Sequence, residues 1–141
     1  MRRAHRLTQQ DQRGSVMVEF AMILPLLLIF FVGIVDFGFI IREHQILQNA
    51  AREGARISTL QTYSGNTAAV QNRVVQYLQQ ENITILAADV TVDQNYVIDI
   101  GGGSAKASRI TVAYSRSMLV GSGWPFGPVA LKAETVFRNL Y

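Results

Sequence analysis

The sequence predicts an α+β protein: a long N-terminal helix that crosses a membrane, then a second helix packed on a small antiparallel sheet of about four strands. Two observations carry this prediction. The first is an unbroken apolar run from Phe20 to Ile41. The second is a change of pattern after position 61, where helical spacing of apolar residues gives way to the alternation of apolar and polar residues that is typical of strands.

Four segments follow from these patterns. We expect a cytoplasmic basic leader over residues 1–14, a transmembrane helix over 15–41, an amphipathic helical stalk over 42–60 and an outer α+β domain over 61–141.

The leader carries the charge imbalance of the chain. It holds Arg2, Arg3, Arg6 and Arg13 against Asp11, which equals the net charge of +3 of the whole protein. Of the 13 basic and 10 acidic residues, nine of each remain after the leader, so no basic face is left for a nucleic acid. We expect no nucleic-acid partner. Because positive flanks stay in the cytoplasm, we expect a single-pass inner-membrane protein with its C-terminal domain in the periplasm.

The run from Phe20 to Ile41 has only one charged residue, Asp36. A hydrocarbon core of about 30 Å needs roughly 20 helical residues, so this run is long enough to cross it. A cleavable secretory signal is the alternative, but its apolar stretch is about 7–15 residues long and ends in a small-residue cleavage site. The length of the run favours a transmembrane helix.

Helical spacing continues beyond the apolar run, so we expect one helix from about Ser15 to about Ile57. A stripe of mostly small residues lies on one side of its upper half: Leu47, Ala50, Ala51, Gly54 and Ala55. Small residues allow close approach of another helix or sheet. The stripe fits a stalk that meets partners and equally a helix that covers its own domain.

The outer domain begins with a second predicted helix over Thr67–Glu81. Four alternating segments then predict strands, and Gly101–Ser104 predicts the hairpin loop between the second and the third. The four strands are marked by Val90 and Val92, by Tyr96 to Ile100, by Ile110 to Tyr114, and by Leu131 through Phe137.

A loop rich in glycine and proline precedes the last strand and contains Trp124 and Phe126. Aromatic side chains on a loop can anchor a partner. They can equally close the open end of a thin hydrophobic core, which we favour because small domains need every large apolar residue.

Enzymatic chemistry has little support in the sequence. No cysteine is present, His44 is the one histidine after the leader, and the zinc-protease and nucleophile-elbow motifs are missing. The glycines of residues 101–106 lack the spacing of a phosphate-binding loop. We expect no catalytic residues, no metal site and no cofactor.

The start of the apolar run has an unusual arrangement. A basic leader ends at Gly14, and an acid, Glu19, follows five residues later, just before Phe20. Ionisable groups at membrane depth are costly and indicate function by default. The alternative is that Glu19 only complements the helix dipole at the membrane edge.

This arrangement resembles the processing site of type IV prepilins. With Leu24-Pro25-Leu26, residues 33–38 and residues 47–56, the segment from about 13 to 57 resembles TadE-like proteins of the Tad (Flp) pilus system.

The resemblance implies that a prepilin peptidase cuts between Gly14 and Ser15, leaving 127 of the 141 residues. Glu19 would then pair with the new α-amine of a neighbouring subunit, although the amine of its own chain, four residues away, competes. Phe20, Pro25 and Asp36 would take part in subunit assembly. Pro25 fits local unwinding during assembly or a tolerated proline, and Asp36 fits a partner contact or an acid at the membrane interface.

The resemblance further implies a structural or assembly subunit, a minor pilin or pseudopilin, with roles in pilus biogenesis, adhesion and biofilm formation. Its partners would be the prepilin peptidase, other Tad pilins and pseudopilins, and the inner-membrane assembly platform. The alternative is an uncleaved single-span protein whose outer domain binds a ligand or regulates an envelope process. A membrane-anchored periplasmic enzyme is the third and weakest hypothesis.

Overall fold

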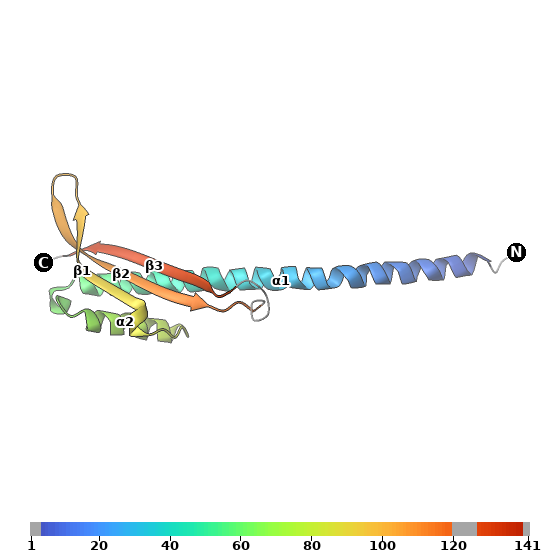
Figure 1. Ribbon diagram of the computed structural model, residues 1–141, viewed down its shortest axis with the longest axis horizontal. Coiled ribbons are helices and arrows are strands. Elements are labelled where there is room, and N and C mark those ends of the chain that lie inside the picture. Colours follow the sequence, from blue (N-terminus) through green and yellow to red (C-terminus); the bar gives the residue numbers. More distant parts are fainter. Residues whose placement is uncertain (1–3, 120–126, 140–141) are drawn as a thin grey trace.

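The computed structural model describes residues 4–119 and 127–139. A very long helix projects from a small domain made of one further helix and one sheet (Figure 1). The elements in chain order are α1 (Ala4–Ser58), η1 (Gln61–Tyr63), α2 (Thr67–Gln80), η2 (Ala87–Asp89), β1 (Val90–Asp99), β2 (Ser104–Arg116) and β3 (Val129–Arg138). The α+β class predicted from the sequence is confirmed.

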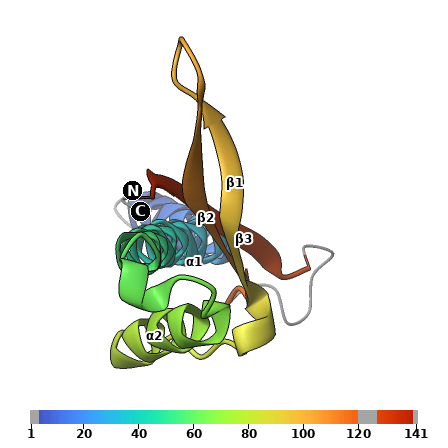
Figure 2. The same ribbon diagram turned by 90° about the vertical axis from the view of Figure 1, so that its left-hand side faces the viewer.

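The sheet is antiparallel, with the strand order β1-β2-β3. Both helices lie on the same side of it, as the view along α1 shows (Figure 2). α1 contacts β2 and β3, while α2 contacts α1 and β1. The first half of α1 extends away from the domain, with the N-terminus at its far end (Figure 1).

α1 extends over 55 residues, from Ala4 to Ser58. Its C-terminal end agrees with the predicted one, while its N-terminal end lies inside the segment expected to be a leader. Residues 14–58 contain a stretch long and apolar enough to cross a membrane, and none of that stretch is buried in the protein. Pro25 lies in this part, and the helix continues through it. The helix is therefore a membrane-length rod in its first half and part of the domain in its second.

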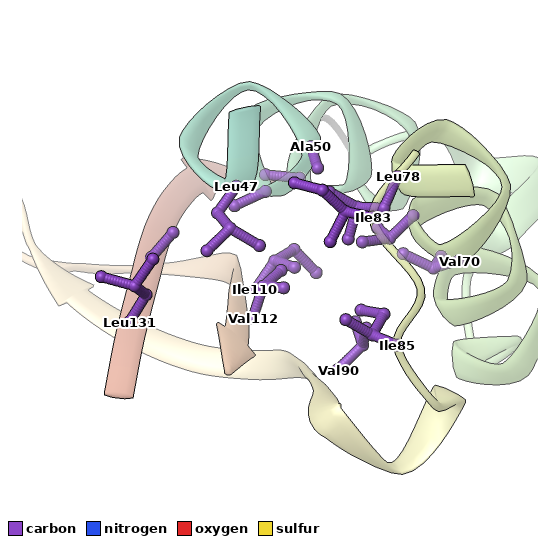
Figure 3. Close-up of a cluster of buried hydrophobic side chains, with 14 of the residues drawn as sticks. Leu47, Ala50, Val70, Leu78, Ile83, Ile85, Val90, Ile110, Val112 and Leu131 are labelled. Atoms are coloured by element: carbon purple, nitrogen blue, oxygen red, sulfur yellow. The ribbon is translucent and has the colours of Figure 1, made fainter. Parts of the chain in front are cut away.

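The core of the domain forms where the second half of α1 meets the sheet and α2. Side chains from α1, α2, the segment before β1 and all three strands converge there (Figure 3). The small-residue stripe supplies Leu47, Ala50, Ala51 and Ala55, all fully buried. In the structure the stripe therefore packs against its own domain.

Gly54 lies where three elements approach most closely. A Cβ atom built on Gly54 would lie 2.5 Å from Cγ2 of Val74 on α2 and 3.5 Å from Cγ2 of Ile110 on β2. Val74 and Ile110 are fully buried and β-branched, so they have little freedom to move aside. The close approach of α1 and α2 thus requires a residue without a side chain at position 54.

We expect Gly54→Val to lower the free energy of unfolding of the domain by about 2 kcal/mol or more, because overpacking a filled core forces strained rotamers and backbone shifts. Gly38→Val is the matched control, since a Cβ atom at Gly38 meets nothing within 4 Å. Urea unfolding of the detergent-solubilised chain, followed by near-ultraviolet circular dichroism, measures both. Equal stabilities of the two variants would contradict the close packing at Gly54.

The sheet has three strands, and the predicted number of about four was wrong. The first two predicted strands are one continuous strand, β1. Asp93 pairs with Arg109 and Tyr96 pairs with Ala107, so two residues of β1 lie opposite the single residue Ser108. This is a β-bulge. Its extra residue interrupts the apolar alternation in the same way as a turn does, which is why one strand was taken for two.

The glycine-rich loop joins two neighbouring strands, as predicted. Gly101 adopts a φ of 77°, a left-handed conformation that favours glycine. Its N–H donates a hydrogen bond to Oδ1 of Asp99 at 2.9 Å, and the N–H of Ile100 donates to the carbonyl oxygen of Gly103 at 3.0 Å. The loop closes the β1–β2 hairpin at the end of the domain far from the projecting half of α1 (Figure 1).

Candidate functional site

The residues of the predicted processing site lie on the projecting half of α1. Gly14, Ser15, Glu19 and Phe20 are exposed, and α1 continues through them without interruption. A Cβ atom built on Gly14 meets no other atom within 4 Å. The fold of the chain itself therefore has no steric need for glycine at this position, so any such need would come from a partner.

The same half of α1 exposes large apolar side chains on every side. Phe20 is 60% exposed and Met22 is 77% exposed, and the other large apolar residues up to Ile41 are exposed as well, except the half-buried Val32, Val35 and Ile40. A helix that is apolar around its whole circumference needs a lipid or protein environment. This surface is the part of the chain that is available to a bilayer or to neighbouring subunits.

A second group of functional residues lies where the projecting half of α1 meets the domain. We call it the clasp: Asp36, Phe39 and Glu43 from α1, with Arg116 and Leu119 from the end of β2 and the segment after it. Spacings of three and four residues place the α1 members on one face of the helix. Asp36 is fully buried, and its Oδ1 accepts a hydrogen bond from the N–H of Leu119 at 3.0 Å.

The charged pair of the clasp is Glu43 and Arg116, whose side chains are only 12% and 14% exposed. Arg116 donates a hydrogen bond from Nη1 to Oε1 of Glu43, and its guanidinium lies 5.0 Å from the ring centre of Phe39. Oε2 of Glu43 and Nε of Arg116 are buried and have no hydrogen-bond partner among the described residues. Each charge therefore depends on the other for compensation.

The exposed helix and the three α1 residues of the clasp belong to one stretch of chain that matches a known family. Residues 14–56 match the family of TadE-like proteins. We call these residues the TadE-like segment. The match confirms the resemblance seen in the sequence, and it begins at Gly14, the residue predicted to precede the cleavage. No curated protein and no solved structure matches the chain.

The TadE-like segment contains all of the predicted site residues, but the structure brings only one of them against the domain. Gly14, Ser15, Glu19, Phe20 and Pro25 lie along the projecting helix, whereas Asp36 lies in the clasp. The sequence analysis missed Glu43 and Arg116. Glu43 lies seven residues after Asp36, on the same face of the helix, and that spacing could have drawn attention to it.

A buried polar network joins Ser58, at the end of α1 and just after the TadE-like segment, to the sheet. The sequence analysis missed this network as well. The amide nitrogen of Gln94, in the β-bulge, donates to Oγ of Ser58 at 3.1 Å and to the carbonyl oxygen of Tyr63 at 2.9 Å. Its amide oxygen accepts from the N–H of Gly65 at 2.8 Å. Ser58 donates to Oγ of Ser108 at 3.0 Å.

The C-terminal end of the sheet completes this network. Ser108 donates to Oδ1 of Asn139 at 2.7 Å, and the side-chain nitrogen of Asn139 donates to the carbonyl oxygen of Gln94 at 3.1 Å. The signal in the sequence was a glutamine at the position where the alternation of β1 calls for an apolar residue. The network connects α1, β1, β2 and the residue after β3 at one point.

Three further features of the sequence were compared with the part of the chain that the structure describes. In the parts of the chain that the structure describes, no three His, Cys, Asp or Glu residues gather in a way that could hold a metal ion. His44 contacts Gln48, one turn further along the helix, with 3.3 Å between the two nitrogen atoms. The aromatic residues Trp124 and Phe126 of the predicted anchor loop lie outside the described residues.

Proposed function

We propose that this protein is a non-enzymatic subunit of a Tad-type pilus, a minor pilin or pseudopilin that acts in pilus biogenesis and, through it, in adhesion and biofilm formation. The observation that carries the proposal is the TadE-like match beginning at Gly14, together with the exposed apolar helix that follows it. The match supports a subunit associated with a Tad pilus. The predicted cleavage after Gly14 is the basis of the mechanism that we propose for its maturation.

A prepilin peptidase would cut the bond between Gly14 and Ser15. Gly14 suits a protease subsite, because the absence of a side chain lets the enzyme approach the backbone closely. Both residues are exposed on a helix that projects from the domain, so the domain does not obstruct access. Cleavage would leave Ser15 as the first residue of the mature chain.

Cleavage also changes the electrostatics around Glu19. In the uncleaved chain the nitrogen of Ser15 is a neutral peptide group within α1. After cleavage it becomes an α-amine, which titrates near pH 8 and is largely charged at neutral pH. In an apolar assembly this ammonium group compensates the carboxylate of Glu19, which is exposed in the monomer and would otherwise be stranded. The pair can form between neighbouring subunits or, four residues apart, within one helix.

Before assembly, the chain would sit in the inner membrane as a single-pass protein with a cytoplasmic N-terminus and a periplasmic domain. The basic leader and the length of the apolar run support this orientation. The prepilin peptidase, other Tad pilins and pseudopilins, and the inner-membrane assembly platform would be its partners.

The test is the intact mass of the chain extracted from its native cell envelope. We expect the mass to correspond to a chain that begins at Ser15, and to one that begins at Met1 in cells without the prepilin peptidase. Gly14→Phe should also leave the chain uncleaved, because a bulky side chain blocks the subsite. Gly33→Phe is the matched control: it too is a helix glycine whose Cβ would meet nothing within 4 Å, and its processing should be unchanged.

Glu19→Gln separates cleavage from assembly. It should be cleaved normally and yet fail to enter pili, because the neutral side chain no longer attracts the α-amine. A native chain that retains its first 14 residues would overturn the proposal and favour the uncleaved single-span protein. The domain surface does offer a groove of about 530 Å³, lined by residues that include Ile85, Tyr114, Leu131 and Lys132, as a place to seek a ligand of such a protein.

A further inference from the structure

The clasp lies deeper along α1 than the end of the apolar run. Asp36 precedes Ile41, the last residue of the run, by five residues. With a rise of 1.5 Å per residue, its Cα atom lies about 7–8 Å inside the apolar segment. The N–H of Leu119 donates to Asp36 at this level. The segment that follows β2 therefore reaches down beside the last two turns of the apolar run.

Leu119 is 62% exposed at this depth, although its backbone contacts a buried carboxylate. Phe37, next to Asp36 on α1, is 63% exposed. Phe37 and Leu119 are therefore both exposed at the same depth along α1. If lipid surrounds α1 at this level, the domain itself enters the lipid through this residue.

Charges mark the level just above. Arg42 is exposed directly after Ile41, and Glu43, which forms the largely buried pair with Arg116, lies two residues beyond the apolar run. Arginine side chains at the end of a span extend toward lipid headgroups. An apolar level carrying Phe37 and Leu119 is thus followed by a charged level, which is the order of layers at a membrane surface.

We propose that Leu119 is a second membrane contact, which inserts into the outer leaflet of the same bilayer that α1 crosses. This inference rests on the proposed membrane function. The occupant is lipid rather than a protein partner, because the level of Leu119 lies within the apolar run that spans the bilayer before any assembly. The domain then rests directly on the membrane surface, with no length of free helix between them.

Asp36 is the positioning residue in this arrangement. A carboxylate within the apolar run is costly unless it is hydrogen-bonded, and the N–H of Leu119 supplies a donor. The same bond links the segment after β2 to α1 at this level. Asp36→Ala removes the acceptor, while Asp36→Asn keeps an oxygen in its place.

The chain has no cysteine, so a single introduced cysteine can be labelled without further changes. We would place a spin label at Leu119→Cys, at Phe37→Cys and at Gly102→Cys in the β1–β2 loop, using the full chain in vesicles of phosphatidylethanolamine and phosphatidylglycerol. Leu119→Cys keeps the backbone N–H that binds Asp36. Power saturation compares the collision rates of each label with oxygen, which concentrates in lipid, and with a water-soluble nickel chelate.

We expect the oxygen-to-nickel ratio at position 119 to approach that at position 37 and to exceed that at position 102 several-fold. Asp36→Ala should lower the ratio at position 119 toward the aqueous value, and Asp36→Asn should largely preserve it.

The labels separate the possible failures. A label at position 37 that is open to nickel overturns the proposed membrane function itself. A lipid-exposed label at position 37 with a nickel-accessible one at position 119 overturns only the inference about Leu119. A label at position 119 shielded from both agents also overturns it, because protein rather than lipid then covers the residue.

Discussion

Arg116→Met should lower the free energy of unfolding of the domain by about 3–5 kcal/mol, the range for removing one partner of a buried ion pair. The methionine side chain fills much of the same volume, but it leaves the carboxylate of Glu43 buried without its positive partner. Oε2 of Glu43 already lacks a hydrogen-bond partner among the described residues, so the remaining carboxylate has little other compensation. Urea unfolding of the detergent-solubilised chain, followed by near-ultraviolet circular dichroism, measures the loss.

Arg109→Met is the matched control for this prediction. Arg109 lies on the same strand and pairs with Asp93 at 3.5 Å, but the two side chains are 37% and 40% exposed. Exposed pairs contribute about 0–1 kcal/mol, so this variant should remain close to the unmodified chain. The double variant Arg116→Met with Glu43→Leu should recover most of the loss, because both charges are then gone. Equal losses for Arg116→Met and Arg109→Met would show that burial of the clasp pair contributes nothing.

Gln94→Leu should also have a large effect, on the order of 2–3 kcal/mol, because leaving buried polar groups unpaired costs about 1–3 kcal/mol. Leucine has a similar volume but cannot bind the N–H of Gly65, the carbonyl oxygen of Tyr63 or Oγ of Ser58. The same unfolding measurement gives the size of the loss. Amide hydrogen exchange at Gly65 should also become faster.

The control for this substitution is Gln76→Leu, since Gln76 is an exposed glutamine in the middle of α2. Its replacement should change the stability by no more than a few tenths of a kcal/mol, as is usual for surface positions. If Gln94→Leu is as stable as this control, the network does not stabilise the junction between α1 and the sheet.

Local patterns predicted the helices well. The period of the apolar residues located α2 to within one residue of its observed end. The helical spacing that continues after Ile41 placed the end of the long helix one residue before its observed end at Ser58, but the helix begins at Ala4, 11 residues before the predicted start at Ser15. Period and run length depend only on neighbours in the chain, which is why they can be read without tertiary structure. The relation of Gly14 to Glu19 is equally local, and it led to the family that residues 14–56 match.

The number of strands could not be obtained in the same way. A β-bulge is defined by two residues of one strand facing one residue of its partner, so it exists only once the register of the pairing is known. Along β1 alone, the polar residues Gln94 and Asn95 look like the turn between two short strands. The pairing with β2 on both sides of Gln94 and Asn95 shows that these two residues belong to a single strand.

The sequence by itself determined that this chain has a membrane-length helix with basic residues, a glycine and an acid near its start, and that a small α+β domain follows. Only the tertiary structure decided which distant residues meet: Asp36 with Leu119, 83 positions later, and Glu43 with Arg116, 73 positions later. Spacing along a helix shows which residues share a face. The partner of that face depends on how strands and helices pack, and this is set by burying the whole core at once rather than by any local pattern.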